Sequence, residues 1–164
     1  MELDAQSDFI TNTKSIRDFI KGLDYQRLNK KPSAKEWSVI ECLEHLIVIE
    51  KSVEKVLELE AVAPRRSYFS KIDMMKNSLL NFDQKYETTE MFYPIGLYSD
   101  ANKAIEEFEK QREQISQKGD LKMLYIGIEH PFFGKLTKLE WIYFCIFHAQ
   151  RHFEQMKKAI LNLD

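Results

Sequence analysis

The sequence has few of the residues that make tight turns, with five glycines and four prolines in 164 residues. An all-β fold needs many such turns, so this shortage argues against one. The two cysteines, Cys42 and Cys145, are too few for a disulfide framework and fit a reducing compartment. No apolar run approaches the roughly 18 residues of a membrane-spanning helix. The N-terminus also lacks the charged-then-apolar pattern of a signal peptide. We therefore expect a cytoplasmic protein with no membrane partner.

Basic residues are not in excess either. The chain has 24 Lys and Arg against 26 Asp and Glu, a net charge of −2, and the two signs are interspersed. Because no basic stripe is present, we expect no nucleic-acid partner. The 44% hydrophobic and 30% charged residues are typical of a globular protein of this length. We predict a single domain over residues 1–164.

Apolar residues recur at helical spacing in four long segments, which predicts four main helices. Two of these segments begin with the pattern of a capping box, in which a Ser or Thr and a Glu three residues later satisfy free backbone N–H groups. The boxes are Ser33-Ala34-Lys35-Glu36 and Thr137-Lys138-Leu139-Glu140, and the third helix has a good cap in Ser99 or Asp100. The predicted helices span about 4–23, 33–60, 99–118 and 137–160.

Residues 61–99 are less regular. A short helix is expected within 68–80, and 88–98 reads as an extended connection because it contains Pro94 and Gly96. A long link suits a four-helix bundle whose middle helices run parallel, since the chain must cross from one end to the other. We therefore predict an all-α, up-down-down-up four-helix bundle with a long crossover between its second and third helices.

The pattern that suggests chemistry lies on the last predicted helix. His148 and His152 are four residues apart, so they share one helix face and can bind one metal ion together. Both lie at the edge of the apolar arc, beside the charged side that carries Arg151, where a side chain faces a cleft rather than the core. The alternative is that they are ordinary boundary histidines, hydrogen-bonded to their neighbours.

The segment from His130 to Ile160 contains HPFFGKLT, then EW, then HAQRH followed by EQ. It resembles the last helix, and the loop before it, of the DinB/YfiT-like proteins. Trp37 and the sequence EHL at residues 44–46 resemble the second helix of the same family. Those proteins are four-helix bundles, many of which carry a divalent metal on three histidines. The resemblance therefore implies that His45, His148 and His152 bind a divalent transition metal, for which zinc and nickel are the first candidates.

The resemblance also implies a function. The family includes metal-dependent transferases that add a low-molecular-weight thiol to an electrophile, and hydrolases. Three histidines leave an open metal position, where a bound thiol or water loses its proton more readily. We therefore expect a small-molecule substrate, with a low-molecular-weight thiol as one candidate, although the residues identify no catalytic side chain. The alternative is a non-catalytic, dimeric binding or stress-response module whose metal is structural or vestigial.

Other side chains near the histidines have plainer interpretations. Cys42 and Cys145 each precede a histidine by three residues but lie deeper in the apolar arcs, so core filling is favoured over a mixed metal site. His130 is expected to serve a turn with Gly134 rather than to line the cleft. Three polar residues lie within helical reach of the histidines, and we expect solvated surface rather than support of a ligand for each. They are Glu41, Glu44 and Gln155.

Tyr143 and Phe147 are expected opposite the apolar arc of the last helix, on a face that bundles normally leave to charged residues. Two adjacent large aromatic side chains on that face need cover. Either part of 61–99 provides it within the monomer, or a second copy of the chain does. We expect a homodimer, because the crossover is polar around 81–90.

Overall fold

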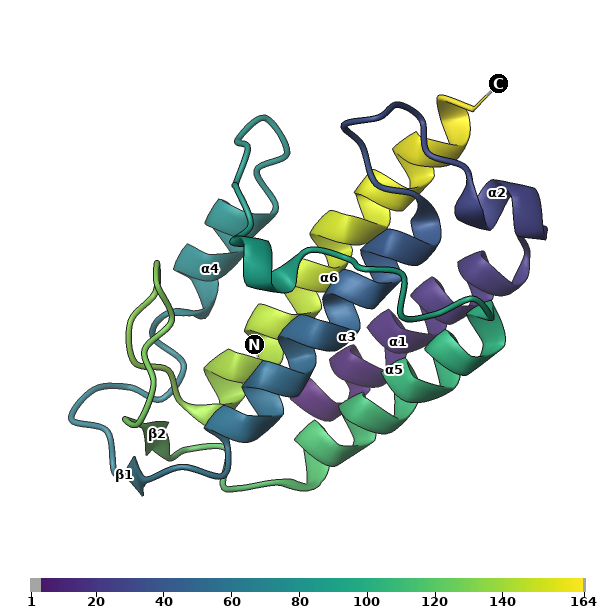
Figure 1. Cartoon of the computed structure of the whole chain (residues 1–164). Coiled ribbons are helices and arrows are strands. Elements are labelled where there is room, and N and C mark those ends of the chain that lie inside the picture. The colour runs from purple at the N-terminus through teal and green to yellow at the C-terminus, as the bar shows by residue number, and fades with distance from the viewer. Residues whose placement is uncertain (1–3, 164) are drawn as a thin grey trace.

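The computed structural model describes residues 4–163, and over this range the chain is mostly helical, with six α-helices (Figure 1). Four of them are long: α1 (Ala5–Lys21), α3 (Val39–Val56), α5 (Ala101–Gln117) and α6 (Lys138–Leu161). Both α5 and α6 pack against α3 and against α1. In Figure 1, α1 and α6 run in one direction while α3 and α5 run in the other. None of the helices within residues 4–163 is both long and apolar enough to cross a membrane.

The connections contain short elements, most of which the sequence did not predict. The helix α4 lies within the segment where a short helix was expected, whereas the sequence predicted neither of the two-residue strands. The strands pair antiparallel, with Ala61 opposite Tyr125. A ladder this short leaves no alternation in the sequence. The short elements are α2 (Tyr25–Asn29), β1 (Ala61–Val62), α4 (Ile72–Leu79), the 3-10 helix η1 (Glu90–Phe92) and β2 (Leu124–Tyr125).

The second long helix begins later than predicted. Residues 33–36 form a turn, in which the Glu36 N–H donates to the Ser33 carbonyl at 3.2 Å. Helix α3 instead starts after Ser38, whose side chain and Glu41 form a capping box. Both sequences fit the pattern S-x-x-E, but only the second leads directly into buried apolar residues, and burial decides between them.

The other helix boundaries lie closer to the prediction. Thr137 caps α6 and forms the predicted capping box with Glu140. Asp100 caps α5, one of the two residues proposed for that role. Helix α3 ends at Val56 rather than near Glu60, because the chain turns there to enter β1.

A buried ion pair crosses the core and joins the long helices. Arg112 on α5 donates to Glu50 on α3, with Nη2 2.7 Å from Oε1, and neither side chain is more than 3% exposed. The same guanidinium donates to Asn12 at 2.6 Å and to Thr13 at 3.1 Å, both on α1. Burial raises the pKa of the Glu50 carboxyl, and the charge of Arg112 opposes that rise. The pair therefore fixes how three helices sit against one another.

Tyr143 and Phe147 are not on an open face, which corrects the expectation from the sequence. They are 4% and 6% exposed and belong to the same core cluster as Ile72 and Met75 of α4. The Tyr143 hydroxyl also donates to Asp8 on α1 at 2.6 Å. Residues of the 61–99 segment therefore cover the two aromatic rings within the monomer. The homodimer loses its supporting argument and stays a prediction.

Candidate metal centre

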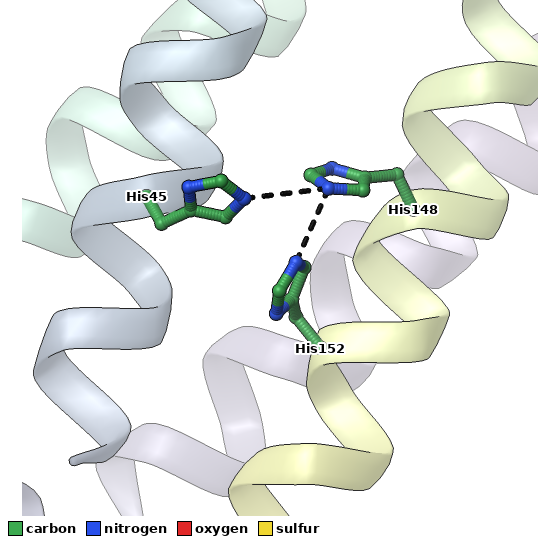
Figure 2. A group of neighbouring side chains, drawn as sticks. All are labelled: His45, His148 and His152. Carbon is green, nitrogen blue, oxygen red and sulfur yellow. Dashed lines mark hydrogen bonds between the residues drawn. The ribbon is translucent and has the colours of Figure 1, made fainter. Parts of the chain in front are cut away.

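Three histidines from two helices meet at the interface of α3 and α6 (Figure 2). The Nε2 atom of His148 lies 3.4 Å from Nε2 of His45 and 3.1 Å from Nε2 of His152. The ligand atoms of all three side chains lie within 4.8 Å of one another. His45 and His152 are buried, and His148 is half-buried. The structure thus brings together the residues that the sequence pattern and the family resemblance selected.

Two of the three rings are oriented by a hydrogen bond from their other nitrogen. Nδ1 of His45 lies 2.9 Å from the carbonyl oxygen of Phe92, and Nδ1 of His152 lies 2.9 Å from Oε1 of Gln155. Because both partners are oxygen acceptors, each Nδ1 carries the proton and each Nε2 presents a lone pair. Gln155 was expected on the solvated surface and instead orients His152 by a hydrogen bond of the kind common at metal-bound histidines.

The spacing of the three Nε2 atoms suits a metal ion. Nitrogens bound tetrahedrally to a metal at about 2.05 Å lie about 3.3 Å from one another. The two separations from His148, 3.4 and 3.1 Å, fall on either side of that value. Without a cation, neutral His148 can donate one proton from Nε2, but two lone pairs face it, those on Nε2 of His45 and of His152. One of them is then left without a partner. A divalent ion satisfies all three nitrogens together, so the donor set fits one.

The surroundings keep the imidazoles neutral, which is the form that binds metal. Burial lowers the pKa of His45. Burial, followed by repulsion from the neighbouring rings, lowers the pKa of His148 well below its ordinary value. Burial and then the nearby His45 lower the pKa of His152 to about 3. Protons therefore do not compete for these nitrogens near neutral pH.

The cysteines stand apart from the histidine cluster. Cys42 and Cys145 are fully buried in separate apolar core clusters, as expected, and burial raises the pKa of each thiol. Among the described residues, the group that could hold a metal consists of the three histidines alone. Within residues 4–163 no fourth protein ligand joins that group.

Glu44 is the residue of this region that the sequence analysis misjudged. It is 2% exposed, although solvated surface was expected. Its carboxylate accepts three consecutive backbone N–H groups, those of residues 95–97, at 2.7 to 3.2 Å. The next residue, His45, donates to the Phe92 carbonyl. Two adjacent residues of α3 thus hold residues 84–98, which we call the strap and which crosses α6 and α3 between α4 and α5 in Figure 1.

The histidines open into a cavity of about 780 Å³, bounded by α3, α6, the strap and the loop before α6. His130 lines this cavity and also makes the predicted turn. Its Nδ1 accepts the N–H groups of Phe132 and Phe133 at 3.1 and 3.3 Å, and its backbone pairs with Gly134 in both directions. Burial lowers its pKa to about 4, but His130 is not part of the metal-ligand group.

The chain is similar to known proteins over most of its length. Residues 9–156 match the family model described as the DinB superfamily, a range that contains all three histidines. A protein of Bacillus subtilis (strain 168), named "Uncharacterized protein YuaE", is 30% identical over 147 residues. This similarity covers 85% of the chain and 86% of the relative.

Proposed function

Since this chain belongs to the DinB superfamily, we propose that it is a metal-dependent enzyme that transfers a low-molecular-weight thiol to a small electrophile. The observation that carries the proposal is the convergence of three Nε2 atoms at the wall of a cavity large enough for a small molecule. We also propose that the four long helices form the up-down-down-up bundle of the family. The strap is then part of the long crossover between the second and third of these helices.

The residues have distinct roles in this proposal. His45, His148 and His152 hold the metal, while the Phe92 carbonyl and Gln155 orient two of the rings. A zinc or nickel ion held there would act as a Lewis acid and lower the pKa of a thiol substrate. The sulfur then forms a bond to the electrophilic carbon, the leaving group departs with its bonding electron pair, and the thiol proton passes to solvent.

A rival function is a binding module with a structural metal. Structural zinc sites are closed by four protein ligands, whereas catalytic sites keep a position open. The cluster of three histidines, with Cys42 and Cys145 buried elsewhere in the core, favours the open kind. Hydrolysis of an ester is the second reaction that such an open position supports, with water in place of the thiol.

We expect metal-loaded protein to conjugate glutathione or cysteine to 1-chloro-2,4-dinitrobenzene at least tenfold faster than metal-free protein at pH 7. At that pH a free thiol of pKa about 8.5 is only a few per cent ionised. A metal-bound thiol that is mostly ionised therefore has a thiolate fraction more than about tenfold higher. The absorbance of the thioether product measures the rate. The same sample after chelation, and again after reloading with zinc or nickel, is the matched control. Equal rates with and without metal, across several thiols and ester substrates, would support the binding module instead.

A further inference from the structure

The wall of the cavity becomes apolar with distance from the histidines. Two rows of side chains continue the helix faces that bear the ligands, because residues three or four apart share a face. Helices α3 and α6 run in opposite directions in Figure 1, so the rows extend side by side from the metal centre toward the same end of the bundle. The rows are Ile49, Val53 and Val56 on α3, and Phe144 and Trp141 on α6.

Aromatic rings form a continuous surface along this wall. The Phe144 ring stacks on His148, with ring centroids 5.3 Å apart and planes at 13°. His130 contacts Phe144 at 4.6 Å and Trp141 at 5.9 Å between centroids. Phe133 lies 4.7 Å from His130 and also lines the cavity. The surface therefore runs from a metal ligand to the loop before α6, and it suits a flat aromatic group.

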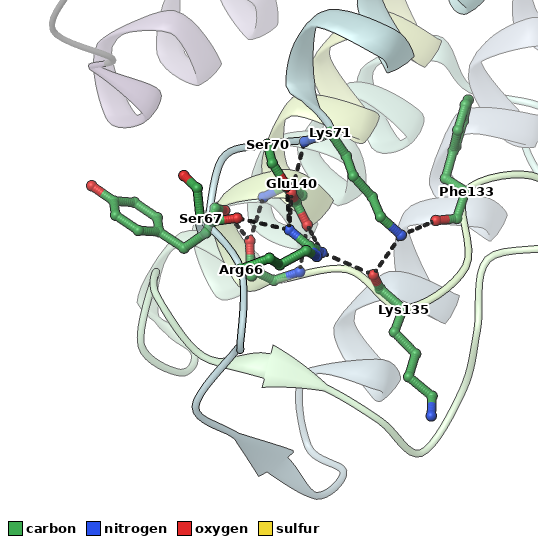
Figure 3. A network of polar contacts seen from close by, with 9 residues as sticks. Arg66, Ser67, Ser70, Lys71, Phe133, Lys135 and Glu140 are labelled. Atoms are coloured by element: carbon green, nitrogen blue, oxygen red, sulfur yellow. Dashed lines mark hydrogen bonds and ion pairs between the residues drawn. The ribbon is translucent and has the colours of Figure 1, made fainter.

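The loop that carries His130 and Phe133 is held in place by a polar network (Figure 3). The fully buried Glu140 carboxylate accepts two hydrogen bonds from Arg66, at 2.6 and 2.7 Å, and one from the Lys71 N–H at 3.0 Å. Arg66 and the Lys71 ammonium both donate to the Lys135 carbonyl at 3.1 Å, and the ammonium also donates to the carbonyl of Phe133. A wall fixed in advance requires little ordering when a ligand binds.

The mouth of the cavity carries exposed apolar side chains next to the charged Lys35, Lys85, Glu87 and Glu129. Met91 of the strap is 76% exposed, and Phe132 and Ile128 of the loop are 68% and 50% exposed. All three line the cavity. Large apolar side chains exposed together around an opening are typical of a binding site, because a ligand removes their surface from water.

We infer that this surface is a subsite for an aromatic or long apolar group carried by the electrophile. From His45 to Val56 the row on α3 extends about 16 Å, at 1.5 Å per residue, which accommodates a ring system or an extended chain. The two rows contain no charged residue. The role of this group as part of an electrophile rests on the proposed function, whereas its binding does not.

Binding is tested on metal-free protein with N-phenyl-1-naphthylamine, a neutral aromatic probe that becomes fluorescent in apolar surroundings. We expect the double variant Phe132→Ser/Ile128→Ser to weaken binding at least tenfold. The control is Phe82→Ser, a 46% exposed phenylalanine in a separate groove of about 750 Å³ between α1, α4 and α6. Its affinity should stay within twofold of the wild type. Unchanged binding in the double variant, or a loss confined to Phe82→Ser, would overturn the subsite.

A second measurement uses the metal-loaded enzyme and compares two electrophiles, 4-nitrobenzyl chloride and chloroacetamide. The double variant should lower kcat/KM at least tenfold for the benzyl compound and less than twofold for chloroacetamide. An equal loss for both electrophiles would contradict an apolar subsite. If neither electrophile reacts with wild-type enzyme, thiol transfer fails as the function, and the probe titration still decides the subsite.

Discussion

Replacing His148 with alanine should abolish stoichiometric metal binding. His148 is the histidine of the cluster that faces both others, with its Nε2 at 3.4 Å from Nε2 of His45 and 3.1 Å from Nε2 of His152. The two remaining nitrogens cannot hold a divalent ion that needs at least three protein ligands in an open site. Elemental analysis of protein purified without a His-tag should show a fall from about one ion per chain to less than about a tenth, since loss of a supporting group alone costs 10- to 100-fold in affinity.

The matched control is His130→Asn. His130 lies beside the cluster but outside it, and an asparagine oxygen can accept the loop N–H groups that Nδ1 accepts now. This variant should keep its full metal content, and circular dichroism should show both variants folded. Full occupancy in folded His148→Ala protein would show that the site is misassigned.

Replacing Arg112 with methionine should lower the free energy of unfolding by about 3–5 kcal/mol, because it leaves the Glu50 carboxylate buried without its partner. Asn12 and Thr13 lose a donor in the same change. A domain of ordinary stability, about 5–15 kcal/mol, loses a large share of it. Urea denaturation at pH 7, followed by circular dichroism, measures the difference.

Arg17→Met provides the comparison. Arg17 also pairs with carboxylates, at 2.9 Å from Asp18 and 3.1 Å from Glu109, but its side chain is 27% exposed and water screens the pairs. This change should leave the free energy of unfolding nearly unchanged, because exposed ion pairs contribute little to stability. The double variant Arg112→Met/Glu50→Leu should recover much of the lost stability, because it removes the uncompensated charge. Equal effects of Arg112→Met and Arg17→Met would show that burial of the pair is unimportant.

The sequence predicted the elements whose signals are local. The Thr137–Glu140 capping box set the start of α6, and a spacing of four residues placed His148 and His152 on one face. His45 came from the family resemblance rather than from spacing, because its partners lie on another helix. The predicted start of α3 was wrong because two possible capping boxes begin five residues apart. Burial of the residues that follow, rather than the sequence pattern, selects the box that begins at Ser38.

Features that depend on distant contacts could not be predicted in this way. The carboxylate of Glu44 binds backbone N–H groups that lie 51 or more residues later in the sequence. The residue types at 95–97 do not indicate that their N–H groups are free to bind a carboxylate. Tyr143 was expected on an outer face because a helical wheel does not show that α4 folds over it. The two strands were not predicted because two residues are too few to show the alternation of apolar and polar residues that marks a strand.

Glu44 and His45 are adjacent and both bind the strap, so we expect the strap to be thermodynamically linked to a metal ion bound by His45. An ion on Nε2 of His45 withdraws electron density from the ring and strengthens the Nδ1–H bond to the Phe92 carbonyl, so we expect the ion to tighten the strap. Linkage is reciprocal, and whatever seats the strap raises affinity for the ion by the same factor. Ile95 of the strap is 78% exposed and is not among the residues that line the cavity. We therefore expect a molecule that binds only the exposed side of the strap to change the occupancy of the metal site without entering the cavity.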